Sequence, residues 1–293
     1  MTDANPHTLF PYRAIVDAPK IAWPGGARVA VWIIPNVEQY RIEIGNPLPD
    51  IRNHSRKDYG NRVGIWRFFD MFDELKLPAA HNTNSLLYDY APQIFDAIRR
   101  RNDEIVAHGR TNAENLHDFK WEADEARVIK EVTDTFARNE GAAPTGWMGA
   151  GTYENSTTPD LLKEAGYKYL MDWPCDDQPI WMRTRSGPLL CVPYPAEIND
   201  SPMVIHRQHT AREFCDMLVD QFDEMIGQCA KEPLVCNISI HPYVFGQPFR
   251  LHPLRAAFRH CLAHKLKDRV WWCKPADISD YCHSLPPGVV PGS

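Results

Sequence analysis

The sequence lacks several features that assign other chains to a class of protein. No apolar stretch approaches the roughly 20 residues that span a bilayer, so no membrane segment is expected. The net charge of −6 argues against nucleic acid or an anionic membrane as a partner. Neither G-x-G-x-x-G nor a P-loop motif occurs, so a dinucleotide or P-loop site has no support. The N-terminal residues lack the basic and apolar regions of a signal peptide, and we expect a cytoplasmic protein.

The cysteines form no metal or redox pattern. The sequence has eight of them, none in a C-x-x-C pair, and the Cys–His spacings match no zinc finger. Several lie in apolar runs, where a free cysteine behaves as a small hydrophobe. We therefore expect reduced, structural thiols, in keeping with a cytoplasmic compartment.

Stretches typical of strands alternate with stretches typical of helices along most of the chain. Such repeats imply parallel strand pairing with right-handed crossovers. We predict an α/β fold, a closed or nearly closed barrel, in a single catalytic domain over residues 1–293, with residues 1–25 as an N-terminal arm. The predicted strands are Arg28–Ile34, Ala79–Asn82, Glu104–Ala107, Thr145–Met148, Lys168–Met171, Leu189–Val192, Val235–Ile240 and Val270–Trp272.

Helical patterns separate these strands, and two stretches lack any pattern. Thr158 and Pro159 are typical of an N-cap and a first helical position. The segments Tyr40–Arg62 and Tyr194–His209 are predicted to be irregular, and long loops of this kind often bind ligands or act as lids. The predicted helices are Ile65–Leu75, Glu122–Asn139, Asp160–Glu164 and Thr210–Cys229.

Four polar clusters directly follow predicted strands. In parallel α/β folds the strand ends converge on one face, so the clusters are expected to form a single pocket. A pocket with a carboxylate and two histidines indicates an enzyme. The clusters are Asn36–Tyr40, His108–Asn112, Asp172–Asp177 and His241–Arg250.

Glu38 and His108 carry the strongest chemical signals of the first two clusters. Partial burial would raise the pKa of Glu38 toward neutrality and suit it to act as a general base, although backbone donors could equally give it a structural role. His108 and Asn112 have the spacing of two metal ligands, but asparagine is a poor zinc ligand. We therefore expect His108 to be a hydrogen-bond donor or an acid–base group.

The later clusters offer an oxyanion site and a second histidine. The glycine-rich segment Gly149–Asn155, which includes Glu154, has backbone N–H groups that a ligand can approach closely. Asp172 is predicted to orient a catalytic histidine. The neighbouring Asp176 and Asp177 are expected to cap turns. His241 ends the most β-like run of the chain, and its neighbours Gln247 and Arg250 favour a functional role.

With these clusters in order, the chain resembles the polysaccharide deacetylase (NodB-homology) superfamily. The resemblance extends from about Tyr12 to Cys282 and is closest to the branch of cofactor-independent allantoinases and cyclic imide hydrolases. Its most specific marks are His108–Asn112, Asp172–Trp173 with Asp176–Pro179, and His241–Pro242 with Gly246–Arg250.

The resemblance implies a distorted (β/α) barrel with its pocket at the strand C-termini. It places Glu38 at the position of the deacetylase base and His241 at that of the general acid. The three metal-ligand positions, aspartate and two histidines in the deacetylases, are occupied by Gln39, His108 and Asn112. With one strong ligand left, we expect no tightly bound metal. The alternative is a weakly bound zinc, held by His108 with Glu38 or His241.

The expected activity is opening of a cyclic imide or ureide ring. The alternatives are an allantoinase, a weakly zinc-dependent amidohydrolase, and a non-catalytic binding barrel. The expected partner is a small cyclic substrate, and the branch implies a homotetramer. The predicted catalytic residues are Glu38, His108, Asp172 and His241, and the predicted substrate-binding residues are Asn36, Asn112, Glu154, Trp173, Gln247 and Arg250.

Overall fold

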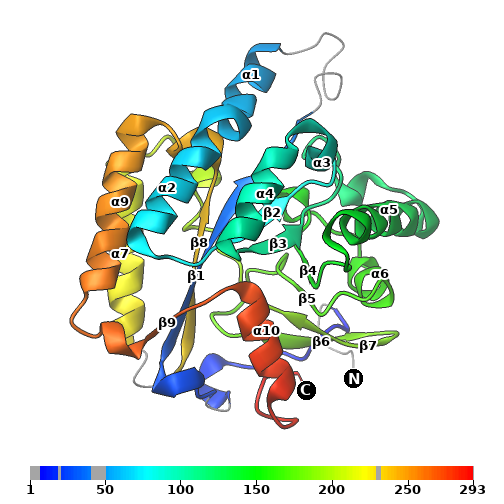
Figure 1. The fold of residues 1–293 in the computed structure, drawn as a ribbon. Coiled ribbons are helices and arrows are strands. Elements are labelled where there is room, and N and C mark those ends of the chain that lie inside the picture. Colours follow the sequence, from blue (N-terminus) through cyan, green and yellow to red (C-terminus); the bar gives the residue numbers. More distant parts are fainter. Residues whose placement is uncertain (1–6, 19–20, 41–50, 229–231, 293) are drawn as a thin grey trace.

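The computed structural model describes residues 7–18, 21–40, 51–228 and 232–292. Strands and helices alternate along the chain (Figure 1). The strands are β1 Val29–Val37, β2 Ala80–Thr83, β3 Glu104–Ala107, β4 Gly146–Trp147, β5 Tyr169–Leu170, β6 Ile180–Thr184, β7 Gly187–Cys191, β8 Leu234–Ile240 and β9 Val270–Trp272. The α-helices are α1 Ile51–Tyr59, α2 Ile65–Leu75, α3 Leu87–Tyr90, α4 Pro92–Arg101, α5 Glu122–Glu140, α6 Thr158–Glu164, α7 Ala211–Gln228, α8 Pro242–Phe245, α9 Pro248–Ala263 and α10 Pro275–Ser284.

The strands form one curved sheet in the order β6-β7-β5-β4-β3-β2-β1-β8, with β9 paired to β1. All neighbours are parallel except β6 and β7, which form an antiparallel hairpin. The segment 193–199 lies beside β8. Ser239 N–H of β8 donates to Ile198 O at 3.0 Å, and Asn199 forms a β-bridge with Ser239. The predicted α/β fold, a distorted barrel, is confirmed.

Alternation along the strands divides the core into two parts. In β1, Val29, Val31 and Ile33 face the helices, whereas Ala30, Trp32 and Ile34 belong to a second cluster inside the curved sheet. The interior cluster also contains Ile278 and Cys282 of α10. Because side chains alternate, the interior row of β1 continues into Asn36 and Glu38.

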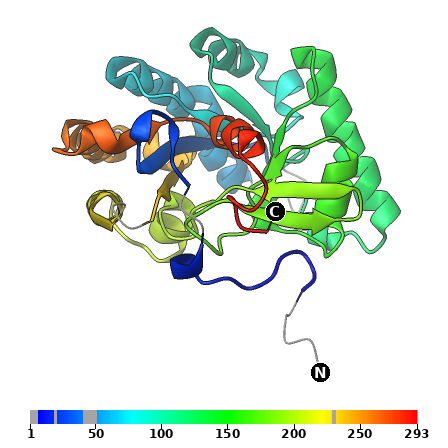
Figure 2. The ribbon, with the colours of Figure 1, turned by 90° about the horizontal axis from the view of Figure 1, so that it is seen from below.

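Helices cover the outer face of the sheet (Figures 1 and 2). The apolar stripe of α2 supplies Phe68 and Phe72 to the outer core, as its helical periodicity predicts. The α2 helix ends at Lys76, which adopts a left-handed conformation with φ 54°. None of the described helices is long and apolar enough to cross a membrane.

The predicted loop Tyr40–Arg62 is wrong over its second half. Residues 51–59 form α1, and Gly60–Gly64 continue it as a π-helical turn, while residues 41–50 lie outside the described residues. The α1 helix is almost entirely polar, so it has no apolar stripe from which to predict it. The predicted irregular stretch Tyr194–His209 likewise contains a π-helical turn at Ser201–His206.

Two smaller expectations also need correction. The antiparallel strand β6 was not predicted, because the pattern suggested only parallel strands. The N-cap of α6 is Thr157, and Thr158 is its first residue. Instead of capping α6, the Thr158 hydroxyl contacts Glu125 and accepts the backbone N–H of Asn155 at 2.8 Å.

Candidate active site

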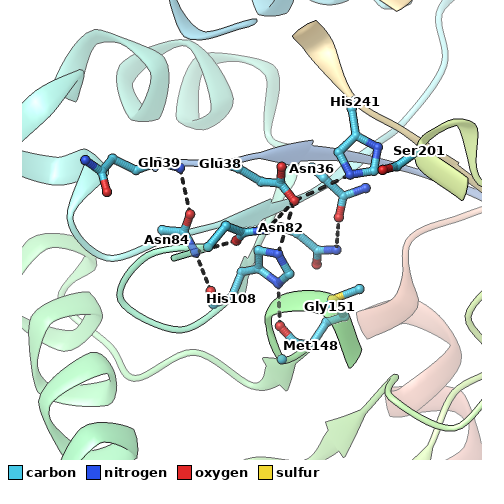
Figure 3. A network of polar contacts seen from close by, with 12 residues as sticks. Asn36, Glu38, Gln39, Asn82, Asn84, His108, Met148, Gly151, Ser201 and His241 are labelled. Atoms are coloured by element: carbon cyan, nitrogen blue, oxygen red, sulfur yellow. Dashed lines mark hydrogen bonds and ion pairs between the residues drawn. The ribbon is translucent and has the colours of Figure 1, made fainter. Parts of the chain in front are cut away.

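Three strand ends bring Glu38, His108 and His241 together (Figure 3). They follow β1, β3 and β8, and each lies one position beyond its strand. Each continues an inward-facing row, marked by Ile34 in β1, Val106 in β3 and Val235 in β8. The three side chains line a cavity of about 520 Å³, whereas the fourth predicted cluster, Asp172–Asp177, contributes only Pro174 to its lining.

The Glu38 carboxylate is buried and surrounded by donors. Its Oε1 atom lies 3.4 Å from Nε2 of His241 and accepts Asn112 Nδ2–H at 2.5 Å. The hydroxyl of Tyr40 donates to Oε2 at 2.6 Å. Burial by itself raises the pKa of Glu38, but the charge of His241 and the contacts with both histidines outweigh burial and hold the pKa well below its usual range. The expected rise toward neutrality is therefore wrong, and Glu38 is ionised.

His241 is held by a second buried carboxylate, Asp200. Asp200 Oδ1 lies 2.6 Å from His241 Nδ1, and Oδ2 accepts the backbone N–H of His241 at 2.9 Å. Burial by itself lowers the pKa of His241, but the charges of Glu38 and Asp200 outweigh burial and raise the pKa to about 10. His241 is thus an imidazolium at neutral pH, between two carboxylates.

The predicted pairing of Asp172 with a catalytic histidine is wrong. Asp172 Oδ1 instead accepts the backbone N–H of Gly149 at 2.8 Å. Its neighbouring side chain is Glu154, whose negative charge helps to raise the pKa of Asp172. Asp200 takes the role expected of Asp172, since it orients His241.

His108 has its tautomer set by a backbone carbonyl. Nδ1 lies 2.6 Å from Met148 O, which can only accept, so Nδ1 carries the hydrogen. In the neutral ring the lone pair is then on Nε2, which lies 3.6 Å from Glu38 Oε1. That distance is too long for a direct hydrogen bond.

A network of buried amides lies beneath the charged residues. Asn36 donates to Ser239 Oγ at 2.8 Å and accepts from Asn82 Nδ2 at 2.8 Å, which ties β8, β1 and β2 together. Asn84 accepts the backbone N–H of Gln39 at 2.7 Å and donates to Asn112 Oδ1 at 3.1 Å. Asn36 lines the cavity as predicted, but much of its hydrogen-bonding capacity is used by the protein.

The metal-ligand positions do not assemble into a site. The side chain of Gln39 points away from Glu38 and both histidines (Figure 3), because it belongs to the opposite row of the strand. Asn112 donates its amide to Glu38. Within the described part of the chain, no group of three or more His, Cys, Asp or Glu is placed to hold a metal. These donors do not fit the metal of the deacetylases.

Several predicted substrate-binding residues lie outside the cavity lining. Trp173 donates its indole N–H to Glu154 Oε2 at 2.7 Å and packs against His7 and Phe10. Arg250 donates to Val244 O at 3.3 Å. The remaining two are Glu154 and Gln247. Asp176 does cap a turn as predicted, since it accepts the backbone N–H of Gln178 at 2.9 Å.

Sequence reasoning missed four residues that contribute to the site. Tyr40 was inside a predicted cluster but received no role, and its signal was its place two residues after Glu38. Asp200 was noted only as part of an irregular stretch. Tyr194 and Ser201 also line the cavity, and Tyr194 is hydrogen-bonded to Ser239 at 2.7 Å. No pattern distinguishes these two from ordinary loop residues.

Comparison with known proteins shows the fold. No model of a known protein family matches the sequence. Over 286 residues the chain is 23% identical to a Schizosaccharomyces pombe protein named "Putative polysaccharide deacetylase", a match that covers 85% of this chain and 88% of that protein.

Two solved structures match 94% of this chain and 99% of their own, each at 24% identity. They are PuuE allantoinase, with a TM-score of 0.81, and a probable polysaccharide deacetylase from Pseudomonas aeruginosa PAO1, with a TM-score of 0.82. The chain therefore has the fold of the polysaccharide deacetylase superfamily, a distorted barrel of the NodB type.

Proposed function

We propose that the protein is a hydrolase that opens the ring of a cyclic imide or ureide by water attack on a ring carbonyl. One observation carries the proposal: an ionised Glu38 lies between the Nε2 atoms of His108 and His241 inside a cavity. This arrangement places a base and an acid beside each other. The allantoinase among the structures that share the fold supports hydrolysis of a cyclic amide.

His108 and Glu38 together can hold the attacking water molecule. The lone pair on His108 Nε2 and the Oε1 atom of Glu38 lie 3.6 Å apart, and both are acceptors. A water molecule has two O–H groups and can donate one to each. Its own lone pair is then free to attack a carbonyl carbon, while Glu38 accepts the proton.

The charge of His241 links the two proton transfers. In the free enzyme the imidazolium keeps the pKa of Glu38 low, so Glu38 is a weak base. When His241 gives its proton to the departing ring nitrogen, the positive charge disappears and the proton affinity of Glu38 rises. Return of the proton from Glu38 to His241, across 3.4 Å, restores the starting state.

The reactivity of an imide ring compensates for the absence of a metal ligand set. The imide nitrogen shares its lone pair between two carbonyls, so each carbonyl is more electrophilic and the nitrogen is a better leaving group. Hydrogen-bond donors can then stabilise the oxyanion, and the loss of one such donor costs roughly 3–4 kcal/mol in other hydrolases. Asn112 lines the cavity, and its amide has a second N–H besides the one that it donates to Glu38.

The cavity wall suits an uncharged polar ring. Among the described residues that line it, there is no Lys or Arg. Amide and hydroxyl side chains line it instead, including Asn115, Asn199 and Ser201. A second candidate substrate is allantoin, because PuuE allantoinase shares the fold over nearly the whole chain.

A panel of substrates tests the proposed function. Succinimide, glutarimide, hydantoin, dihydrouracil and allantoin should be compared with an N-acetylated sugar oligomer, with ring opening followed by chromatography. We expect turnover of at least one ring and none of the sugar. Deacetylation of the sugar without ring opening would refute the proposal.

A further inference from the structure

The carboxyl groups of Asp172 and Glu154 lie outside the reaction centre and are close enough to interact with each other. Asp172 follows β5, and Glu154 follows the turn formed by Gly149–Tyr153. Gly151, Thr152 and Tyr153 of this turn line the substrate cavity. The two acids therefore lie behind one wall of the site.

Among the described residues, a hydrogen-bond donor reaches one oxygen of each of the two carboxyl groups. Asp172 Oδ1 accepts the backbone N–H of Gly149 at 2.8 Å, and Glu154 Oε2 accepts the indole N–H of Trp173 at 2.7 Å. The other two oxygens, Asp172 Oδ2 and Glu154 Oε1, are buried and receive no donor from the described residues. A proton between these two acceptors would satisfy both of them.

The surroundings favour retention of that proton. Burial raises the pKa of Glu154 to about 7, and burial together with the charge of Glu154 raises the pKa of Asp172 well above its usual range. The other charged or titratable groups that act on the pair are Glu125 of α5 and the thiol of Cys191 in β7, next to which lies Cys175. Glu125 opposes a second negative charge on the pair, whereas the thiol of Cys191, whose pKa is raised well above its usual range, stays uncharged.

The turn itself needs support at both ends. Gly151 and Thr152 have left-handed backbone conformations, with φ of 67° and 58°. A β-branched residue in that conformation is strained and persists only where its surroundings hold it. The pair holds the first residue of the turn through Gly149 N–H, and Glu154 directly follows the last.

We propose that Asp172 and Glu154 share one proton and act as positioning residues that hold the Gly149–Tyr153 turn in place as a wall of the substrate cavity. This inference rests on the proposed function for its kinetic readout. With one shared proton, three hydrogens satisfy the four oxygens. A second proton would set an O–H against the N–H of Gly149 or Trp173, so acidification loosens the turn.

Acidification is expected to lower kcat/KM. As pH falls through about 7, the pair gains its second proton and kcat/KM falls, mainly through a higher KM, because the wall rather than the reacting groups is disturbed. Protonation of Glu38 does not explain such a fall, since its pKa lies far lower.

Three variants test the proposal. Glu154→Gln retains an acceptor for Trp173 and gains an amide donor for Asp172, but it does not titrate. We expect the wild type to lose about tenfold in kcat/KM per pH unit below 7, and Glu154→Gln to be flat from pH 5 to 8. Glu154→Ala, which removes the link, should raise KM at least tenfold at every pH.

Glu104→Gln is the matched control. Burial also raises the pKa of Glu104 to about 7, but Glu104 begins β3, at the opposite end of the strand from His108. This variant should show the same fall in kcat/KM below pH 7 (the acidic limb of the profile) as the wild type. A flat wild-type profile, or a limb that persists in Glu154→Gln or disappears in Glu104→Gln, would overturn the proposal.

Infrared spectroscopy of the free protein separates this inference from the proposed function. At pH 9 the shared proton should give a protonated-carboxyl band in the wild type and in Glu104→Gln, and no such band in Glu154→Gln. The same band in all three proteins would overturn the proposal, whatever substrate the enzyme takes. The expected pattern supports it even where no ring in the panel is opened.

Discussion

The Oε1 atom of Glu38 lies 3.4 Å from Nε2 of His241, and each group stabilises the charge of the other. The imidazolium lowers the pKa of the carboxyl, and the carboxylate helps to raise the pKa of the imidazole to about 10. The site therefore enters each turnover with an ionised base and a protonated acid across the whole neutral range.

Replacement of Glu38 by glutamine should remove the base and keep the shape of the site. We expect kcat to fall by at least roughly 10²-fold, the low end of the contribution of general acid–base catalysis. Steady-state kinetics on the best ring substrate measures the effect, and circular dichroism checks the fold. Near-normal turnover in a folded Glu38→Gln protein would show that another group activates the water.

Asp200→Asn should move the alkaline limb of the pH profile. The carboxylate of Asp200 contributes to the high pKa of His241, so its loss lowers that pKa by about 1–3 units. The fall in kcat/KM expected near pH 10 in the wild type should then occur at lower pH. Asp220→Asn, an exposed change on α7, is the control and should leave the limb in place.

Stability should follow the same titration. The folded pKa of His241, about 10, lies above the unfolded value of about 6.5. Its contribution to the free energy of unfolding is therefore complete below pH 6.5 and is lost as pH rises through 10. Asp200→Asn should lose stability over a narrower and lower range of pH, as measured by urea titration. Identical pH dependence in the two proteins would contradict the assignment.

Activity should survive removal of metal ions. Of the three ligand positions of the deacetylases, only His108 presents a strong ligand, and tight zinc sites use three or four. After prolonged dialysis against EDTA we expect unchanged ring opening, and elemental analysis should find well under one metal per chain. Loss of activity on dialysis, with recovery when zinc is returned, would instead support a site built from His108 with Glu38 or His241.

Gly64→Ala should destabilise the protein and disturb His241. A Cβ at Gly64 would overlap the backbone carbonyl of Pro242, the residue after His241. Overpacking of this kind costs about 1–3 kcal/mol, and here the obstacle is backbone that cannot rotate aside. Gly227→Ala is the control, because a Cβ there meets nothing within 4 Å. Equal unfolding free energies for the two variants would refute this reading.

The sequence was sufficient to predict the positions of the reacting groups. Apolar runs end directly before His108 and His241 and shortly before Glu38, and parallel strands place such ends on one face. The alternation within β1 also explains why Gln39 is not a ligand. Ile34, Asn36 and Glu38 lie on the interior face of the strand, and Gln39 lies on the opposite face. This explanation requires that β1 extend to Val37, whereas the apolar run from which the strand was predicted ends at Ile34.

Two other features depend on contacts between distant segments. Asp200 lies 41 residues before His241 along the chain, in a stretch without periodicity, so no local pattern pairs them. The α1 helix carries no apolar stripe, and local patterning therefore does not distinguish it from a solvated loop. The low pKa of Glu38 also depends on a neighbour, since burial alone predicts a shift in the opposite direction.

The strand ends supply the reacting groups and the connecting segments supply the cavity wall, and this separation has an evolutionary consequence. Glu38, His108 and His241 are supplied by the sheet, whereas Gly151–Tyr153 and Tyr194–His206 supply much of the wall around the ring. Insertions, deletions and exchanges in those connecting segments can change which ring is accepted without moving the base or the acid. Related enzymes on this scaffold can therefore diverge in substrate by replacing wall segments and inherit the chemistry unchanged.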